Sequence, residues 1–419
     1  MSVQGHQPGR KDWLRLALVT IAVGVGAGLA GIAIVLVLNA TAYLAFGHSP
    51  GSGTLLESIE QTPPWRRFAA VTSAGIIGAI GWYLLRRRPP LPISDDDAVQ
   101  GQKMPTFKTI ADGLLQMVVV GLGGSAGREL APRQMGALVG AWLSSKSGLS
   151  SEERKALVAC GAGAGLAAVY DIPLGGAIFA LEVVYLGFRV PVVIMAVTTS
   201  AIAATVGGLL VPETPLFALE RMEVTPQLYI WAILAGPIFG LGGAWFARGI
   251  GWLIARRPTT ARILWLMPLT YAAVGLIAWP LPEILGDGGP LSTTAFNADT
   301  TLIVLALAIA VKAAVTLATY GVGTAGGTLT PSIAFGASLG ALLGGIWNIF
   351  WPGTPIAAFA VVGAAAFLAS AIHAPISALV IVIEFTGQSF DFYVPMMFAV
   401  AGSAFVGRYI MRRSITGAF

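Results

Sequence analysis

The sequence predicts an all-α integral membrane protein that crosses the bilayer several times, with helices of uneven length. Three observations indicate this class. Hydrophobic residues make up 56% of the 419 residues and charged residues only 11%, whereas a soluble domain carries about 25% charged residues. The mean hydropathy is +0.78. The 53 glycines favour closely packed membrane helices, because small residues let helix backbones approach one another.

Four apolar stretches are long enough for complete membrane helices, since the hydrocarbon core needs roughly 20 helical residues. They cover residues 16–46, 68–85, 190–211 and 263–281. The first is too long for a cleavable signal and is expected to remain as the first membrane helix. Shorter apolar segments, interrupted by Gly and Pro, cover residues 114–126, 130–143, 157–172, 173–188, 335–351, 356–372 and 375–383. Broken helices at membrane depth line a cavity or are buried in protein, so we expect an internal site.

Charged residues indicate the orientation and exclude some partners. The net charge is +5, and the basic residues form short clusters beside apolar runs. The positive-inside rule places these clusters and both termini in the cytoplasm, with the protein in the cell membrane. Such short clusters do not suit nucleic acid. A single cysteine, Cys160, excludes an internal disulfide, and no Cys cluster offers a metal site. We expect no metal, no cofactor and no enzymatic activity.

An internal repeat runs through the chain. Residues 121–142 align without gaps to residues 321–342, with seven of 22 positions identical. Residues 161–182 align to residues 363–384, again with seven of 22 identical. Two matching blocks in the same order and at nearly the same offset favour a true duplication. Paired repeats with interrupted helices are typical of transporters whose site lies between the repeats.

Both copies of the first block contain a Gly-rich loop followed by a helix. Residues 123–132 read Gly-Gly-Ser-Ala-Gly-Arg-Glu-Leu-Ala-Pro, and residues 323–331 read Gly-Thr-Ala-Gly-Gly-Thr-Leu-Thr-Pro. A helix start offers unpaired N–H groups and the positive end of a dipole. Two facing helix starts would bind an anion without any full positive charge, weakly enough for the anion to leave again.

Glu129 lies inside the first of these loops. A carboxylate within a membrane is costly and suggests a function. In one interpretation it occupies the anion site itself and leaves when it is protonated or displaced. In the other it forms an internal ion pair or cap with Arg128. The residues alone leave both interpretations open.

Three ordered motifs resemble the CLC family of chloride channels and proton-coupled anion exchangers. Residues 127–129, Gly-Arg-Glu, are similar to the start of that family's second anion motif. Residues 327–331 are similar to its third motif, with Leu329 where Phe is usual. Residues 101–105 fall where the first motif belongs. The resemblance covers nearly all of residues 13–419 and is that of a divergent prokaryotic-type member without cytosolic CBS domains.

The resemblance implies a homodimer with one anion pathway per subunit and two inverted repeats of broken, tilted helices. It implies a cytoplasmic tail over residues 1–12 and one transmembrane domain over residues 13–419, with repeats at about 66–211 and about 228–419. Glu129 would be the gate. The implied anion-binding residues are Gln102, Lys103, Gly127, Arg128, Leu130, Thr328, Leu329, Thr330 and Thr416. Chloride is the expected anion, and protons are a second partner that the resemblance leaves open.

Three departures from the family pattern bear on mechanism. Gln102 and Lys103 replace Ser-Gly of the first motif, Thr416 stands where a Tyr hydroxyl is expected, and Val183 stands where exchangers carry a proton-relay glutamate. Its neighbour Glu182 is the structural glutamate of that region. The missing relay favours a channel-like or weakly proton-coupled pathway. The alternative is a 2:1-type anion/proton antiporter.

Two other classes of protein also match parts of the sequence. Ser125 with His373 could form an intramembrane serine protease, although the repeat carries Ala325 in place of Ser125. We expect His373 instead to connect two helices. An unrelated, ion-coupled carrier with broken helices is the second rival. Lys312 ends an apolar run, and we expect it to snorkel or to pair with an acid such as Glu384, with no assigned role.

Overall fold

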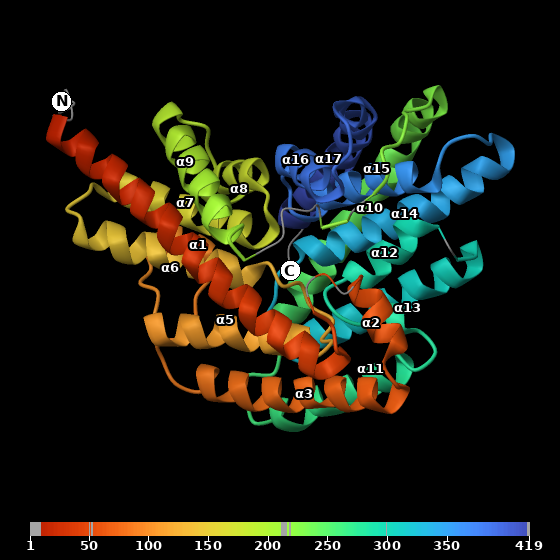
Figure 1. Ribbon diagram of the computed structural model, residues 1–419, viewed down its shortest axis with the longest axis horizontal. Coiled ribbons are helices and arrows are strands. Elements are labelled where there is room, and N and C mark those ends of the chain that lie inside the picture. The colour runs from red at the N-terminus through yellow and green to blue at the C-terminus, as the bar shows by residue number, and fades with distance from the viewer. Residues whose placement is uncertain are drawn as a thin grey trace. The chain divides into compact units, whose positions relative to one another are not determined.

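The computed structural model describes residues 10–49, 51, 53–210, 216–217, 219–298 and 300–416. All regular structure within these residues is helical, apart from an isolated β-bridge between Gly127 and Gly327. Seven of the described helices are long and apolar enough to cross a membrane. The predicted all-α, polytopic class is therefore confirmed. The chain divides into two compact units, whose helices are labelled in Figure 1.

The first unit contains residues from 1–32, 93–106 and 132–211. Its helices are α4 (Asp95–Val99), α6 (Leu130–Lys146, which begins two residues earlier, in the second unit), α7 (Ser151–Tyr170), α8 (Pro173–Phe179), the π-helix η1 (Ala180–Tyr185) and α9 (Val190–Gly207). Helix α1 (Arg10–Phe46) starts in this unit and continues into the second. The long first apolar run is thus one helix, as predicted. The segment predicted at 173–188 is split between α8 and η1 and ends at Tyr185.

Glycine lets the helices of this unit approach closely. Helix α7 is buried from Ala156 to Tyr170 and packs against α4, α8 and α9. A Cβ on Gly161 would lie 2.3 Å from the carbonyl oxygen of Gly136 in α6, which no real side chain tolerates. The high glycine content therefore reflects backbone-to-backbone packing, as expected for membrane helices.

The second unit contains residues from 33–92, 107–131 and 212–419. Its helices are α2 (Leu55–Gln61), α3 (Pro64–Arg86), α5 (Thr106–Gly121), α10 (Pro226–Arg256), α11 (Ile263–Ile277), η2 (Pro282–Ile284), α12 (Gly289–Asn297), α13 (Leu302–Gly321), α14 (Leu329–Phe350), α15 (Ile356–Ala371), α16 (Pro375–Thr386), η3 (Phe390–Phe392) and α17 (Tyr393–Thr416). Helix α14 lies along α15, α3 along α11, and α10 against α17 and α15 (Figure 1).

The duplication predicted from the sequence is also visible in the packing. In the second unit a Cβ on Gly363 would lie 2.5 Å from the carbonyl oxygen of Gly336, which repeats the Gly161–Gly136 approach of the first unit. Asp171 and His373, at equivalent positions before α8 and α16, both have left-handed backbones, with φ of 52° and 59°. His373 therefore connects two helices, as predicted.

Lys312 does not reach a membrane surface, so the snorkelling prediction is wrong. Its side chain is fully buried, and Nζ donates hydrogen bonds of 2.7 Å to the carbonyl oxygens of Ile284 and Gly286. The acid that acts on its charge is Asp287 and not Glu384. The irregular chain at 284–286 needs donors for its buried carbonyl groups, and the lysine supplies them.

Candidate functional site

The site is built from two loops that meet through their backbones. Each loop leaves a helix that ends at a glycine, Gly121 or Gly321, and leads to the start of α6 or α14. Where they meet, the Gly127 N–H donates to Gly327 O at 3.1 Å and the Gly327 N–H donates to Gly127 O at 3.0 Å. Equivalent residues of the two repeats thus pair with each other, which is the signature of a local two-fold axis. The predicted facing loops are confirmed.

The Glu129 carboxylate binds to the first turn of α14 and is fully buried. Its Oε1 accepts hydrogen bonds from the backbone N–H groups of Leu329 and, at 3.3 Å, of Thr330. Its Oε2 accepts one from the Thr330 hydroxyl at 2.8 Å. These N–H groups belong to a first helical turn, whose donors the helix's own carbonyl groups do not reach and where the helix dipole favours negative charge. The carboxylate therefore occupies an anion site that the backbone of the other repeat provides.

Tyr320 lies at the bridge and was missed by sequence reasoning. Its hydroxyl donates to Gly327 O and accepts from the Gly127 N–H at 3.2 Å. It is fully buried at the end of α13. A buried tyrosine one residue before a Gly-rich loop is the signal that could have identified it, since a buried hydroxyl needs polar partners. Tyr320 ties the two loops together from one side.

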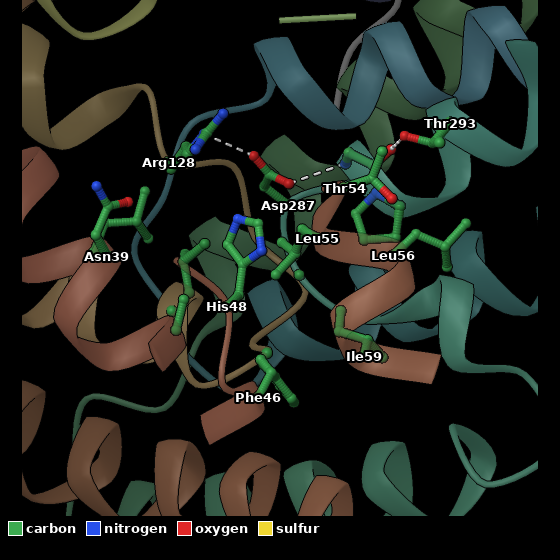
Figure 2. A pocket seen from close by; sticks show the side chains of 18 of the residues that line it. Asn39, Phe46, His48, Thr54, Leu55, Leu56, Ile59, Arg128, Asp287 and Thr293 are labelled. Atoms are coloured by element: carbon green, nitrogen blue, oxygen red, sulfur yellow. Dashed lines mark hydrogen bonds and ion pairs between the residues drawn. The ribbon is translucent and has the colours of Figure 1, made fainter. Parts of the chain in front are cut away.

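Arg128 turns away from the bridge, toward a second acid that sequence reasoning also missed. Its Nε lies 2.9 Å from Asp287 Oδ2, and Asp287 Oδ1 accepts from the Gly289 N–H at 2.9 Å. Figure 2 shows this pair beside a cavity. An acid in the sequence Gly-Asp-Gly-Gly, directly before α12, was the available signal, because such residues cap helix starts. Of the two interpretations of Glu129, these contacts favour occupation of the anion site.

The structure brings together some of the predicted anion-binding residues. Gly127, Leu329 and Thr330 surround the Glu129 carboxylate or its bridge. Leu130 begins α6, and Thr328 precedes α14. Gln102 and Lys103 belong to the first unit, between α4 and α5.

Three further candidates, Gln102, Lys103 and Thr416, have no contact with the Glu129 carboxylate among the described residues. Gln102 and Lys103 are exposed, and Gln102 Nε2 donates to Asp97 Oδ1 at 3.3 Å. Thr416 is the last residue of α17, and its side chain lies outside the described residues. The participation of all three in an anion site stays a prediction.

The protease interpretation does not match the hydrogen bonds. The Ser125 hydroxyl lies 3.0 Å from the Thr316 hydroxyl, and among the described residues no hydrogen bond joins Ser125 to His373. His373 lines a separate small cavity with Ser370 and Arg408. Ser125 instead supports the loop, since its carbonyl oxygen accepts from the Thr319 hydroxyl at 2.7 Å.

Comparison with known proteins identifies the family. Residues 94–408, more than half of the chain, match the family described as voltage gated chloride channel. A voltage-gated ClC-type chloride channel ClcB of Salmonella typhi is 27% identical over 379 residues, covering 84% of this chain and 89% of the relative. The protein of the same name from Escherichia coli O157:H7 is 27% identical over 412 residues, covering 91% and 96%.

Solved structures show the same fold. A slow cyanobacterial Cl⁻/H⁺ antiporter matches with a TM-score of 0.81 at 21% identity, over 98% of this chain and 99% of the other. A CLC-type fluoride/proton antiporter matches with a TM-score of 0.75 at 22% identity, over 96% and 98%. The family match excludes an unrelated broken-helix carrier. The chain therefore belongs to the CLC family of voltage-gated chloride channels, a family of multi-span membrane proteins that transport anions.

Proposed function

We propose that this chain carries chloride across the cell membrane through a pathway that Glu129 gates. The observation that carries the proposal is the position of the Glu129 carboxylate on the backbone N–H groups of Leu329 and Thr330. A carboxylate and a halide compete for the same donors, because both are anions that a helix start stabilises. The pathway is closed while the carboxylate is bound and open when it leaves.

The N–H groups at the start of α14 would then bind the permeating anion. The donors have no formal charge, so the anion is stabilised without being trapped, as conduction requires. The Thr330 hydroxyl adds one more donor, now used by Glu129 Oε2. Gly127, Leu130 and Thr328 complete the backbone around this position, and Arg128 acts from the adjoining cavity.

Gln102 and Thr416 are assigned to the anion where the family has a coordinating Ser and a Tyr hydroxyl, and Lys103 is assigned to the inner mouth of the pathway. The assignment rests on their match to the family motifs. Lys103 is exposed and offers a cation that would attract anions toward this mouth. Gln102 offers an amide N–H₂ group, which already donates to Asp97.

The pathway is proposed to be channel-like or at most weakly coupled to protons. Position 183 carries a valine, which can neither accept nor donate a proton. Val183 lies within the π-helix η1 and lines a cavity with Asp96 and Glu152. Reconstituted protein should therefore dissipate an anion gradient without moving protons uphill, and uphill proton movement would establish the antiporter alternative.

Assembly and orientation follow the family. We propose a homodimer with one pathway per subunit, both termini in the cytoplasm, and residues 13–419 acting as one transmembrane domain without enzymatic activity. The basic residues near both ends of the chain support this orientation, because cytoplasmic loops carry an excess of Lys and Arg.

The decisive experiment measures anion efflux from liposomes with simultaneous pH recording. Glu129→Gln removes the charge at nearly constant shape, so the side chain holds the α14 donors less firmly. Charged hydrogen bonds contribute about 1.5–3 kcal/mol each, so efflux at neutral pH should rise roughly tenfold and lose its pH dependence. Glu220→Gln, in an exposed loop, is the matched control and should behave as wild type. Wild-type efflux and pH dependence in Glu129→Gln would contradict the gating proposal.

A further inference from the structure

A cavity of about 310 Å³ lies beside the Glu129 loop within the second unit. The last turns of α1, helix α2, the chain before α12 and Arg128 form its walls. Figure 2 shows the labelled side chains around it. The cavity does not contain the Glu129 carboxylate, and it shares Arg128 with the loop that carries that residue. It is therefore the neighbouring compartment on the Arg128 side of the site.

The formal charges on the walls cancel. Among the residues that line the cavity, Arg128 and Asp287 carry a formal charge at neutral pH. They form the ion pair described above. Asp287 is the more deeply placed partner, with 6% of its side chain exposed against 22% for Arg128. Lys312 acts on Asp287 but does not line the cavity. A third titratable group therefore decides whether the net charge of the cavity lining is zero or positive.

That group is His48. Its ring points into the cavity toward Asp287 and Arg128 in Figure 2, and its Nδ1 lies 3.0 Å from the Ser58 hydroxyl. Partial burial lowers the pKa of His48 below its ordinary value of 6.5, and the positive charge of Arg128 lowers this pKa further, while Glu57 on α2 raises it. The ring is thus neutral at pH 7 and gains a positive charge only in acid.

We propose that this cavity is a second anion-binding site, which holds a small hydrated inorganic anion between Arg128 and His48 and binds it more tightly when His48 is protonated. The inference rests on the proposed function, because the anion it holds is the one that passes Glu129. With His48 neutral the lining charges sum to zero. With His48 protonated the sum is one positive charge.

Size and lining suit an anion that still carries water. A water molecule takes up about 30 Å³ in the liquid, so the cavity has room for a halide together with several waters. Asn39 and Thr54 add polar side chains, whereas Leu38, Phe46 and Ile59 add apolar surface. Apolar walls focus the field of a charge placed between them, so one proton on His48 has a large local effect.

The primary test measures how anion efflux saturates with chloride concentration, with the same pH on both sides of the liposomes. It is done in the Glu129→Gln background, which removes the titration of the gate. The half-saturating chloride concentration should fall about fivefold as the pH is lowered from 7.5 to below the pKa of His48, as expected for one added charge at roughly 8 Å in a medium of intermediate polarity. His48→Asn should abolish this fall.

Two further variants sharpen the test. His373→Asn makes the same change at a histidine outside the cavity and should keep the fivefold fall. Asp287→Asn retains an oxygen that can accept from the Gly289 N–H and removes one negative charge, so it should lower the half-saturating concentration about fivefold at pH 7.5. A pH effect that survives His48→Asn overturns the proposal, and so does an unchanged affinity in Asp287→Asn.

A binding measurement separates this inference from the proposed function. NMR of ¹³C-labelled histidine follows the His48 ring, which His48→Asn identifies. Because linkage is reciprocal, added chloride should raise the pKa of His48 and leave that of His373 unchanged. A chloride-dependent shift in protein whose efflux ignores Glu129→Gln would keep the second site and reject the gate. An unshifted His48 in protein with a working gate would reject the second site alone.

Discussion

The loop that precedes α6 and the loop that precedes α14 have the same backbone and different side chains. In both, the second residue after the helix is a glycine with positive φ, 95° at Gly123 and 103° at Gly323. The backbone hydrogen bonds also correspond, since the Gly123 N–H donates to Val120 O at 2.9 Å and the Gly323 N–H to Tyr320 O at 3.0 Å. The duplicated sequence has therefore kept one loop geometry twice.

The side chains of the two loops have different roles in the site. The first loop carries Arg128 and Glu129, where the second has Thr328 and Leu329. The first copy supplies the acid, and the second supplies the N–H donors that hold it. A symmetric backbone thus builds an asymmetric site, because one copy supplies the carboxylate and the other supplies the helix start that binds it.

The largest expected effect comes from breaking the bridge between the copies. A Cβ at Gly127 would lie 2.3 Å from the carbonyl oxygen of Gly327, so Gly127→Ala forces the two loops apart. Displacement of about 1 Å in a site reduces activity roughly 100-fold, and we expect a loss of that size in anion efflux. Gly327→Ala should lose less, because the new Cβ meets the Glu129 side chain rather than backbone.

Gly251→Ala is the control for the bridge prediction. It adds a methyl group to α10 where no other atom lies within 4 Å, so efflux should stay at the wild-type level. Wild-type efflux in Gly127→Ala would mean that the meeting of the two loops is not needed for function.

An intermediate effect is expected at the equivalent buried charges Asp112 and Lys312. Lys312→Met leaves the carbonyl oxygens of Ile284 and Gly286 without their charged donor, which costs about 3 kcal/mol. Asp112→Asn still accepts from Trp82 Nε1, now at 2.8 Å from Asp112 Oδ1, and should cost about 1 kcal/mol. The free energy of unfolding in detergent measures both.

Lys155→Met provides the reference for removing a lysine. Lys155 is exposed on α7 and lies 3.8 Å from Glu152, and such surface pairs contribute about 0.5 kcal/mol or less. Equal losses for Lys312→Met and Lys155→Met would contradict a structural role for the buried lysine.

The smallest effect on efflux is expected from removing one hydrogen-bond donor of the second copy, the Thr330 hydroxyl. Thr330→Val removes the hydroxyl that binds Glu129 Oε2 at 2.8 Å and keeps the backbone N–H. Losing one charged hydrogen bond of about 1.5 kcal/mol should open the gate roughly tenfold more often at neutral pH, seen as faster efflux. Thr328→Val is matched, because the Thr328 side chain makes no capping hydrogen bond, and it should leave efflux unchanged. Slower efflux in Thr330→Val would show that the hydroxyl binds the anion more than it holds the gate.

Much of the fold could be predicted because its determinants are local. Apolar runs of about the length that spans the bilayer, or longer, gave the helices near 16–46 and 68–85 directly. That the two Gly-rich loops face each other also followed from sequence, since paired repeats with interrupted helices place their site between the repeats.

The rest depended on contacts between residues far apart in the chain. Asp287 pairs with Arg128, and His48 reaches the same cavity from the end of α1, yet no motif links these positions. Lys312 was predicted to snorkel or to pair with an acid such as Glu384. The snorkelling alternative was wrong because the 284–286 turn, invisible in the local sequence, needed a buried donor, and the acid that acts on the lysine is Asp287.

The bridge between Gly127 and Gly327 also constrains how the chain is made. Two loops 200 positions apart must meet, and contacts of such sequence separation close late, because closing a long loop loses much chain entropy. A nascent chain inserted as far as α10 already contains Glu129 but lacks the Leu329 and Thr330 donors that bind its carboxylate. A chain whose synthesis stops before residue 330 therefore leaves the Glu129 carboxylate in the membrane without the donors of α14, at the cost that a carboxylate carries there.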